Sequence, residues 1–478
     1  MPDRFRTAIH WFRRDLRLTD NTALLAAVRS AETVAPVFVL SDWRDSHGWT
    51  GPKRQHFLCG CLDSLARNLD AIGGRLIIRR GEAPAELEKL IRQARADALF
   101  FNRDPDPFGR ETERRVAELC ASLGVAVRSF KDVVLHEPGE VLTGGGDPYR
   151  VYTPYAKNWF SRPKDKPAAR PRAIRSPDGL DSLAPPALQT WNLSPDSAAN
   201  PPEAGERAAR GRLQRALAGP VRVYAEKRDF PAVDGTSRLG ADLRFGTLSI
   251  REVFRRAAEA AAAAETDTER ASIHTFQKQL AWREFFMTIL HHWPNVLDEE
   301  FAPQWRGLPW DDPESGGGKF ERWRRGLTGF PLVDAGMREL RETGHMHNRV
   351  RMIAAMFLTK DLHLHWRLGE AHFMRHLLDG EIANNNGGWQ WSAGTGADAA
   401  PYFRIQNPWT QTARYDPDGE YIRRWVPELA GIRDPKRFQT PPADDRPIAD
   451  DYPLPLVDHR AERGRTLAIF KRHATQQG

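Results

Sequence analysis

The stretch from Gly344 to Arg404 combines charged, amide and aromatic side chains that could together hold a planar ligand. It contains HNRVRM, an acidic pair at Asp379 and Glu381, three consecutive asparagines, a Gly-Gly step and two tryptophans one residue apart. Charged and amide groups are costly to bury among indoles unless they gain partners. We therefore expect this stretch to surround a large, flat ligand that has a polar edge.

The spacing within HNRVRM places its side chains on different parts of a helix surface. Asn348 and Met352 are four residues apart and share a face, and Arg349 and Arg351 flank that face. The acidic pair further along the chain could neutralise Arg351 or accept hydrogen bonds from the ring edge of a ligand. The segment is therefore suited to holding polar and apolar parts of a ligand side by side.

Two tryptophan motifs offer further ligand contacts. Trp389 and Trp391 would diverge by roughly 200° on a helix, so one could face a substrate cavity and the other the protein interior. In QKQLAWREFF, Gln279 and Trp282 share a helix face, and Arg283 follows directly. Each tryptophan could equally pack in a core, and Gln279 could equally point to solvent.

Two segments could contact anions. In RDFPAVDGTSRLG, a Gly-Thr-Ser turn and Arg238 precede a helical stretch, and this combination suits a pyrophosphate. Thr236 or Ser237 could instead be an ordinary helix cap. Near the N-terminus, FRRDLRLTDN could face a ligand crevice or form a solvated salt-bridge network. The sequence has no GxGxxG and no P-loop motif, so ordinary dinucleotide or NTP binding has no motif support.

Composition sets broad limits on the protein. The 478 residues carry 70 Lys and Arg against 63 Asp and Glu, a net charge of +7 that permits a polyanionic partner such as DNA. Three cysteines without metal-ligand spacing fit a reducing compartment. The charged N-terminus does not resemble a secretory signal, and no apolar run approaches the ~18 residues of a membrane span. We expect a soluble, cytoplasmic protein.

Strands and helices alternate along the first part of the chain. This alternation predicts an α/β domain with a parallel sheet and right-handed crossovers, which we place at residues 1–131. Asp20 or Asn21 could cap the first helix. The expected strands are 7–11, 34–40, 75–78, 98–102 and 125–130, and the expected helices are 22–28, 55–71, 83–94 and 111–123.

Residues 132–205 are expected to be a connector, and residues 206–478 an all-helical domain. The segment 161–208 is dense in Pro, Ser and Ala, and it cannot hold long helices or central strands. Beyond it only the helical period is visible, so the predicted fold class is α/β followed by all-α. The expected helices are 208–218, 249–264, 272–293, 320–326, 331–343, 347–358, 368–378 and 387–393.

Several of these segments occur together in one known family. RDFPAVDGTSRL, WREFF, TGFPLVDAGMREL, MHNRVRM and NNGGWQW resemble the DNA photolyase/cryptochrome family in order and spacing, and the resemblance covers most of the chain. The sequence is most similar to microbial cyclobutane pyrimidine dimer photolyases. The resemblance implies light-driven repair of UV-damaged DNA, in which photoexcited, reduced FAD passes an electron to a dimer flipped out of the duplex.

The resemblance also implies roles for individual residues. Arg351 and Asp379 would form an ion pair beside the isoalloxazine of FAD, and Asn385 would sit against flavin N5. The full set of FAD-binding residues would be Tyr224, Thr236, Ser237, Arg238, Leu239, Arg283, Arg351, Asp379, Glu381 and Asn385. The lesion would meet Gln279, Trp282, Asn348, Arg349, Met352 and Trp391, and the DNA backbone would meet Arg228 and Arg404.

The same resemblance implies a chain of tryptophans that conducts electrons to the flavin. Trp389 would lie nearest the flavin, Trp366 next, and Trp310 at the surface. Indoles suit this role because they can be oxidised, and because a row of them shortens each hop. Their presence predicts that FAD in this protein can be reduced by light.

Two alternative functions stay open at this point. Gln279 stands where dimer photolyases usually have Glu, and Gln is common there in 6-4 photoproduct photolyases and animal cryptochromes. Asn348 and Met352 stand where 6-4 enzymes have histidines, which disfavours 6-4 repair because neither side chain can serve as an acid. The other alternative is a blue-light photoreceptor of the cryptochrome type.

The resemblance further implies a second, light-harvesting chromophore of deazaflavin, flavin or folate type in the α/β domain. The loop NRDPDPFGRE, residues 102–111, lacks the Asn-Glu pair of many folate binders and is closer to deazaflavin or flavin binders. No metal is expected. The protein would work as a monomer that requires no protein partner and no membrane, in the cytoplasm and at the nucleoid when bound to DNA.

Overall fold

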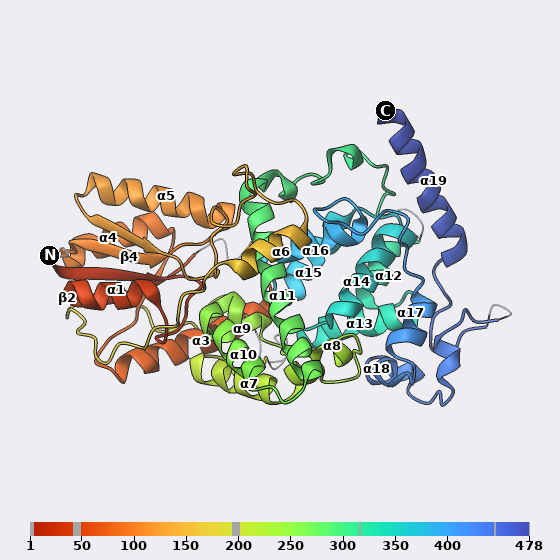
Figure 1. Ribbon diagram of the computed structural model, residues 1–478, viewed down its shortest axis with the longest axis horizontal. Coiled ribbons are helices and arrows are strands. Elements are labelled where there is room, and N and C mark those ends of the chain that lie inside the picture. The colour runs from red at the N-terminus through yellow and green to blue at the C-terminus, as the bar shows by residue number, and fades with distance from the viewer. Residues whose placement is uncertain (1–3, 42–48, 194–200, 315–316, 444–445, 478) are drawn as a thin grey trace. The chain divides into compact units, whose positions relative to one another are not determined.

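The computed structural model describes residues 4–41, 49–193, 201–314, 317–443 and 446–477. These residues form two compact units (Figure 1). Unit 1 comprises Met1–Tyr149, Thr153–Arg222 and Ser237–His292, and unit 2 comprises Arg150–Tyr152, Val223–Thr236 and Trp293–Gly478. The domain boundaries expected at residues 131 and 205 are boundaries along the sequence, whereas the two units are defined by contacts between residues. The expected boundaries therefore stay a prediction.

Unit 1 contains the parallel five-stranded sheet that the sequence predicts. The strand order is β3-β2-β1-β4-β5, and every neighbouring pair is parallel. The central strand β1 is buried along most of its length, as expected where both faces of a parallel sheet are covered. The strands are β1 Phe5–Phe12, β2 Ala31–Leu40, β3 Ile77–Arg80, β4 Ala98–Asn102 and β5 Ala126–Phe130. The strand predicted at 75–78 is therefore displaced by two residues.

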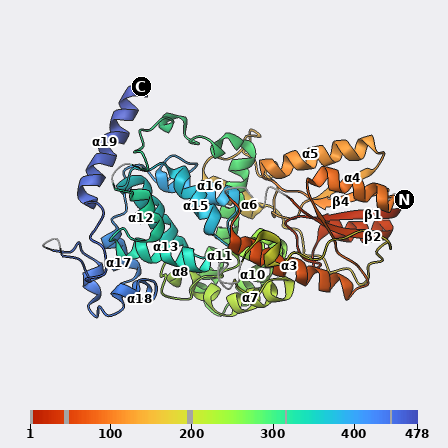
Figure 2. The ribbon, with the colours of Figure 1, turned by 180° about the vertical axis from the view of Figure 1, so that it is seen from behind.

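Helices cover both faces of this sheet (Figures 1 and 2). Leu90 of α4 and Val116 of α5 pack in one cluster with Ile9 and Leu99 of the sheet, and α1 lies on the opposite face. The helices that follow the strands are α1 Thr22–Ser30, α3 Pro52–Asp70, α4 Ala83–Ala94 and α5 Pro107–Ser122.

Local capping explains where two of these helices begin. The Asn21 side chain accepts the N–H of Leu24 at 3.1 Å, so Asn21 caps α1 as expected. Helix α5 begins at Pro107 rather than at residue 111, because the Asp106 carboxylate accepts the N–H of Gly109 at 2.7 Å.

The Pro-rich segment that follows residue 161 lies along the edge of the sheet in unit 1. Leu183 donates its N–H to the Ile78 carbonyl at 2.9 Å, and the Ser182 hydroxyl accepts the Ile78 N–H at 2.9 Å. These bonds occupy the open side of the edge strand β3. Where this segment is described, its one regular element is a short 3₁₀ turn, Leu188–Trp191, which confirms the expected lack of long helices and strands.

Helices also make up the rest of unit 1. They include α11, whose 26 residues carry the QKQLAWREFF motif. The sequence did not predict α6. The helices are α6 Tyr152–Ser161, which begins at the last residue of a unit 2 segment, α7 Glu206–Ala218, α9 Gly240–Phe245, α10 Ile250–Ala262 and α11 Asp267–His292.

Unit 2 is helical, and its described residues contain no strand. Its core is rich in large aromatic side chains, among them Trp323, Trp366, Trp389 and Tyr421. The helices are α8 Tyr224–Lys227, α12 Lys319–Arg325, α13 Pro331–Thr343, α14 Asn348–Met356, α15 Trp366–His376, α16 Ile382–Ala393, α17 Pro408–Tyr415, α18 Glu420–Trp425 and α19 His459–Gln477. The fold class expected from the sequence is confirmed.

Several helix boundaries in unit 2 differ from the sequence prediction, among them α15, which spans Trp366–His376 rather than 368–378, and two of the differences have a visible local cause. Helix α16 begins at Ile382 rather than at residue 387, because the Glu381 carboxylate caps it by accepting the N–H of Asn384 at 2.9 Å. The helix predicted at 347–358 continues beyond Met356 as a π-helical turn, Phe357–Asp361. Periodicity could not show either feature, because both depend on individual hydrogen bonds.

Candidate functional site

Helix α14 begins with a cluster of Asn348, Arg349 and Met352, which we call the α14 cluster. The Asn348 amide nitrogen lies 3.7 Å from Met352 Sδ, and Arg349 Nη1 lies 3.8 Å from the same sulfur. Arg349 is held from two sides, since Nη2 donates to Asp229 at 2.8 Å and the guanidinium lies 4.6 Å from the centre of the Tyr415 ring. The sequence pattern predicts the three cluster residues together, but it does not contain the two supports of Arg349, which come from distant parts of the chain.

His347 caps α14 directly beneath this cluster. Its Nδ1 accepts the N–H of Arg349 at 3.2 Å, so the neutral ring carries its proton on Nε2. Burial, together with the neighbouring His345, lowers the pKa of His347 to about 4. The imidazole is therefore uncharged at neutral pH and supplies no acid beside the cluster.

Arg351 and Asp379 form the ion pair that the sequence predicts. Arg351 Nη2 lies 3.1 and 3.0 Å from the two Asp379 oxygens, and its Nε donates to the Met346 carbonyl at 2.7 Å. Burial raises the pKa of the Asp379 carboxyl, but the attraction of Arg351 outweighs burial, and the pKa lies below its ordinary value. Both side chains are 25% exposed, so the pair can still face a ligand.

The three consecutive asparagines of α16 point to different partners. Asn384 donates to Glu381 at 2.7 Å, Asn385 donates to the Glu370 carbonyl at 3.0 Å, and Asn386 donates to the Glu370 carboxyl at 2.9 Å. Burial raises the pKa of Glu370 to about 7, against the lowering effect of its bond from Asn386. Glu370, which sequence analysis missed, therefore fixes two neighbouring amides at once.

The three tryptophans expected to conduct electrons all lie in unit 2. Trp366 and Trp389 are almost completely buried, and Trp310 is partly buried. Gly369, one turn after Trp366 on α15, touches the Trp389 ring so closely that a methyl group at position 369 would collide with it. At the other end, the ring of His365 lies 5.6 Å from Trp366 and 5.3 Å from Trp310, measured between ring centres.

The other predicted residues of unit 2 are partly or fully exposed, and they lie on α8, on α16 and in the segments between helices. Trp391 is partly exposed whereas Trp389 is buried, so the two tryptophans do serve different environments. The Arg228 guanidinium lies 5.8 Å from the ring centre of Tyr224, whose pKa is raised by burial. Arg404 is exposed. Thr236 is the last residue of the unit 2 segment that contains Tyr224.

Unit 1 carries the Ser237–Leu239 part of the phosphate motif and Arg283. Arg238 is exposed and adopts a positive φ of 50°, which is uncommon for a residue with a side chain. Leu239 is buried at the start of α9. Arg283 Nη1 donates to the Val133 carbonyl at 2.9 Å.

Gln279 and Trp282 lie on α11 in the same unit. Gln279 Nε2 donates to the Thr275 carbonyl at 3.3 Å, and the Trp282 ring packs 5.6 Å from Phe285. The residues expected to bind FAD and the lesion are thus divided between the two units. That both sets contact one cofactor and one lesion stays a prediction.

The N-terminal FRRDLRLTDN segment does not form a solvated salt-bridge network, and its alternative role beside a ligand crevice stays a prediction. Its charges are buried in unit 1, where Arg14 Nη1 lies 2.8 Å from Asp104 and Arg17 Nη2 lies 2.7 Å from Asp132. Asp20 is buried as well and pairs with Arg251 at 2.9 Å. The expectation of a solvated network is wrong, because these side chains find charged partners far away in the sequence and become structural.

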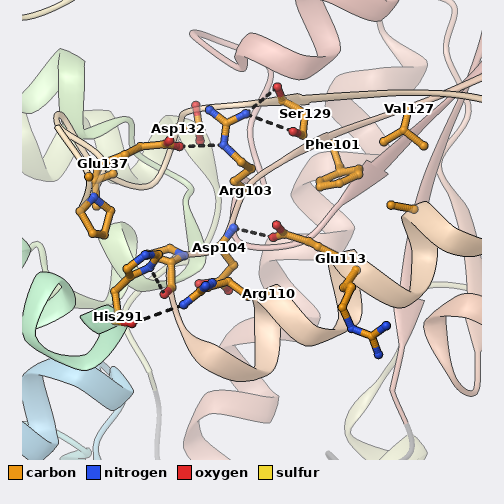
Figure 3. A pocket seen from close by; sticks show the side chains of 16 residues that line it. Phe101, Arg103, Asp104, Arg110, Glu113, Val127, Ser129, Asp132, Glu137 and His291 are labelled. Carbon is orange, nitrogen blue, oxygen red and sulfur yellow. Dashed lines mark hydrogen bonds and ion pairs between the residues drawn. The ribbon is translucent and has the colours of Figure 1, made fainter. Parts of the chain in front are cut away.

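Unit 1 also contains a cavity of about 490 Å³ at the carboxyl ends of β4 and β5 (Figure 3). Arg103 closes one side, where Nε donates to Glu137 at 2.8 Å and Nη1 donates to the Ser129 carbonyl at 2.7 Å. Arg110 donates to the His291 carbonyl at 3.3 Å, and burial lowers the pKa of His291, as does Arg110. Four of the lining residues come from the segment 102–111, namely Arg103, Asp104 and Pro105 after β4 and Arg110 on α5.

Among the described residues, no group of three or more His, Cys, Asp or Glu side chains is placed to bind a metal ion. Across the same residues, no helix combines the length and the apolar character needed to cross a bilayer.

Comparison with known proteins identifies close relatives. Residues 276–472 match the family model "FAD binding domain of DNA photolyase", and residues 8–172 match the model "DNA photolyase". The chain is 39% identical over 471 residues to the deoxyribodipyrimidine photo-lyase of Synechococcus sp., which covers 97% of this chain and 96% of that protein.

Two solved structures are also similar over nearly the whole chain. The bacterial class III photolyase from Agrobacterium tumefaciens is 37% identical with a TM-score of 0.90, and the match covers 98% of each chain. An archaeal photolyase from Sulfolobus tokodaii with two FAD molecules is 29% identical with a TM-score of 0.84, covering 98% of this chain and 100% of that one.

Proposed function

The chain belongs to the photolyase/cryptochrome family, and we propose that it is a light-driven DNA repair enzyme that splits cyclobutane pyrimidine dimers. The observation that carries the proposal is the composition of α14. This helix presents Asn348 and Met352 in one cluster and holds Arg351 in an ion pair with Asp379. Amide and thioether groups suit a lesion, and an ordered guanidinium–carboxylate pair suits the polar edge of a flavin. The name of the Synechococcus relative supports the same substrate.

The residues present fit FAD as the cofactor. The Arg351 guanidinium is fixed by Asp379 and by the Met346 carbonyl yet keeps a quarter of its surface, so it is preorganised to face a ring. Asn385 is buried with its amide nitrogen bonded to Glu370, so its orientation is fixed too. Tyr224, Thr236, Ser237, Arg238, Leu239, Arg283 and Glu381 would complete the binding set. When bound, FAD would absorb blue light and supply the electron that opens the dimer.

The α14 cluster would recognise the lesion without donating a proton. The Asn348 amide can hydrogen-bond base edges, Met352 can contact the dimer through its thioether, and Arg349 can pair with a phosphate. His347 stands beside them but is neutral because its pKa is about 4. A site without an acid favours splitting of a cyclobutane dimer over 6-4 repair, which requires proton transfer. Gln279, Trp282 and Trp391 would provide the remaining lesion contacts.

Trp389, Trp366 and Trp310 would carry electrons toward the cofactor. The contact between Trp389 and Gly369 of α15 and the His365 ring between Trp366 and Trp310 support a continuous path within unit 2. Burial of the two inner indoles keeps water from them. Trp310, which is partly exposed, would exchange electrons with reductants in solution.

We also propose that the cavity at the ends of β4 and β5 holds the light-harvesting chromophore. Its volume of about 490 Å³ falls within the range of small-molecule sites, and four of its lining residues come from the segment 102–111. The second FAD molecule of the archaeal photolyase supports a chromophore in addition to the catalytic flavin. Replacing Ala117, which lines the cavity, by Trp should remove this chromophore from the purified protein, whereas Trp at the exposed Ala121 of the same helix should not.

The partner would be UV-damaged DNA, contacted along its backbone by Arg228 and Arg404. We propose that the protein works in the cytoplasm as a monomer and associates with the nucleoid when it binds DNA. The positive net charge of +7 favours such binding and predicts that it weakens with salt.

One assay tests the proposed function against its alternatives. Purified protein carrying chemically reduced FAD is illuminated with oligonucleotides that contain a thymine dimer, a 6-4 photoproduct or no lesion. We expect repair of the dimer alone. Repair of the 6-4 lesion would favour the alternative that Gln279 suggests. An absence of turnover on both lesions would leave a photoreceptor function as the better explanation.

A further inference from the structure

The indole nitrogens of unit 2 differ in what they face. Trp366 donates its Nε1–H to Glu300 Oε1 at 3.1 Å, and both side chains are buried. Trp323 donates to a backbone carbonyl, that of Ala354, at 3.1 Å. The Nε1–H of Trp389 is buried without a hydrogen-bond partner among the described residues. Of the two inner tryptophans in the proposed path, therefore, the middle one faces a carboxylate and the innermost one does not.

The segment around Glu300 is anchored so that this contact is kept. Phe301 donates its N–H to the Gln390 side chain at 2.8 Å, and Ala302 donates to the Thr395 carbonyl at 2.9 Å. The Glu300 carbonyl itself accepts from Arg306 Nε at 3.1 Å. These bonds tie the segment to α16 and to the loop that follows it, so the carboxyl oxygen stays at the edge of the indole.

The charged surroundings of Glu300 leave its carboxyl group directed at the indole. His365 Nε2 lies 4.0 Å from Glu300 Oε1, beyond hydrogen-bond distance, while His365 Nδ1 is used to accept the N–H of Arg367. Arg306 Nη2 pairs with Glu299 at 3.0 Å, and Arg367 Nη2 pairs with Asp298 at 3.1 Å. The nearby guanidinium groups thus have other carboxylate partners.

We propose that Glu300 accepts the indole proton of Trp366 when that indole loses an electron. This inference rests on the proposed function of the tryptophans as an electron path. The oxidant would be the oxidised indole of Trp389, which would have lost one electron to bound, photoexcited FAD in its oxidised state. One electron passes from Trp366 to Trp389, the N–H bond of Trp366 breaks, and the proton forms an O–H bond on Glu300.

This step conserves electrons and protons, and its products return to the starting state less easily than a pair formed by electron transfer alone. Trp389 returns to its neutral, closed-shell state, Trp366 becomes a neutral radical, and Glu300 becomes a carboxylic acid. An oxidised indole is a far stronger acid than a neutral one, so a carboxylate already bonded to the N–H takes the proton without rearrangement. Return of the electron then requires return of the proton. Trp389, whose N–H has no acceptor in the described part of the chain, keeps its proton and passes its charge on.

Transient absorption after a light flash tests the proposal, because cationic and neutral tryptophan radicals have different spectra. The measurement uses FAD-loaded protein with Trp310→Phe, so that the charge stops at Trp366. We expect a neutral radical in this background, formed several-fold more slowly in D₂O. With Glu300→Gln added, the cation should persist and the isotope effect should vanish. Glu299→Gln, which removes the adjacent carboxylate, should behave like the parent.

A second measurement needs no flavin chemistry. The ultraviolet resonance Raman difference between the wild type and Trp366→Phe isolates the Trp366 indole, and its N–H band reports hydrogen-bond strength. Glu300→Gln should shift this band toward that of a weaker bond, and Glu299→Gln should not. A neutral radical that forms equally fast in Glu300→Gln, or an unshifted band, would overturn the proposal.

The proposal and the proposed function fail in different ways. Absence of dimer repair by chemically reduced wild-type protein would sink the repair function, but the radical spectra would still decide the role of Glu300. If the flash oxidised Trp366→Phe to the same extent as the wild type, the charge would bypass this residue. The proposed electron path and the role of Glu300 would then both be contradicted, whereas the result of the repair assay would be unaffected.

Discussion

Helices α14 and α15 begin in the same way and then serve different purposes. Each starts with the pattern His-X-Arg, in which the histidine Nδ1 accepts the arginine N–H at 3.2 Å. Each arginine pairs with an aspartate from elsewhere in unit 2, Arg349 with Asp229 and Arg367 with Asp298. The residue X is the exposed Asn348 in α14 and the buried Trp366 in α15.

The difference shows that the histidine cap fixes where residue X and the arginine lie, and that the surrounding residues determine what these two side chains can do. In α14 the first helical residue is exposed, and the arginine is held against the Tyr415 ring with its side chain only 16% exposed. In α15 the first residue enters the core, and the arginine is 47% exposed. We therefore expect equivalent substitutions in the two helices to have different effects, in binding for α14 and in electron transfer for α15.

The largest expected effect comes from the buried residue X. Trp366→Phe should slow photoreduction of the bound flavin by on the order of 100-fold, equivalent to about 2.7 kcal/mol, because phenylalanine is much harder to oxidise than tryptophan. The rate of flavin bleaching under blue light with an external reductant measures this. Asn348→Ala, the same position in α14, should leave the bleaching rate within twofold. Equal slowing in both variants would contradict the proposed division of roles.

The second largest difference between the two helices is expected from their arginines, in DNA binding. Arg349→Ala should weaken binding of dimer-containing DNA by on the order of 10- to 100-fold, or about 1.4 to 2.8 kcal/mol, because an ordered guanidinium is lost from the cluster. The slope of the logarithm of the binding constant against the logarithm of the salt concentration should also become shallower by about one. Arg367→Ala is the matched control and should bind normally in the same fluorescence-anisotropy titration. If binding weakened equally in both, general charge rather than the α14 cluster would be responsible.

The histidines should differ in how stability responds to pH. His347 has a pKa of about 4 in the folded protein against an ordinary value of 6.5, so the unfolded chain binds more protons between these values. The contribution of the neutral His347 to the free energy of unfolding is therefore fully present above pH 6.5, and it falls as the pH drops toward 4. From pH 7 to pH 5 the free energy of unfolding should decrease by about 2 kcal/mol more in the wild type than in His347→Asn, which retains a cap.

Urea unfolding at the two pH values measures this difference. His365→Asn is the matched control. The pKa of His365 is also lowered by burial, but its side chain is 36% exposed, so its contribution should be smaller. An equal pH dependence in both variants would show that burial does not distinguish the two caps.

The last expected effect, one on stability alone, concerns packing along α15. Gly369→Ala should destabilise the protein by about 1 to 3 kcal/mol, because its methyl group would collide with the Trp389 ring. Gly388→Ala, at a helical glycine of α16 with open space around it, should change stability by less than about 1 kcal/mol and could raise it. Thermal unfolding compares the two. A stable Gly369→Ala variant would mean that the ring can move aside.

Sequence alone predicted the parallel sheet, most helices and the α14 cluster, because these depend on periodicity and local spacing. It also predicted the Arg351–Asp379 pair, through resemblance. It missed Asp229, Tyr415, Glu370 and Glu300, which act through contacts between residues far apart in the chain. It was wrong about the N-terminal arginines, because charge density cannot show that Arg17 and Asp132 meet in the interior. Burial and long-range pairing are the properties that a linear pattern does not contain.

The close approach of Gly369 to the Trp389 ring offers a rule for reading related sequences. The two positions are twenty residues apart, yet they must be compatible with each other, because a side chain at 369 and an indole at 389 compete for one space. In a relative that has both a side chain at position 369 and an indole at position 389, the packing around this contact must differ. In a relative that lacks the indole, the glycine can be replaced. Inspecting the two positions as a pair should therefore separate relatives that keep the inner electron donor from those that have abandoned it.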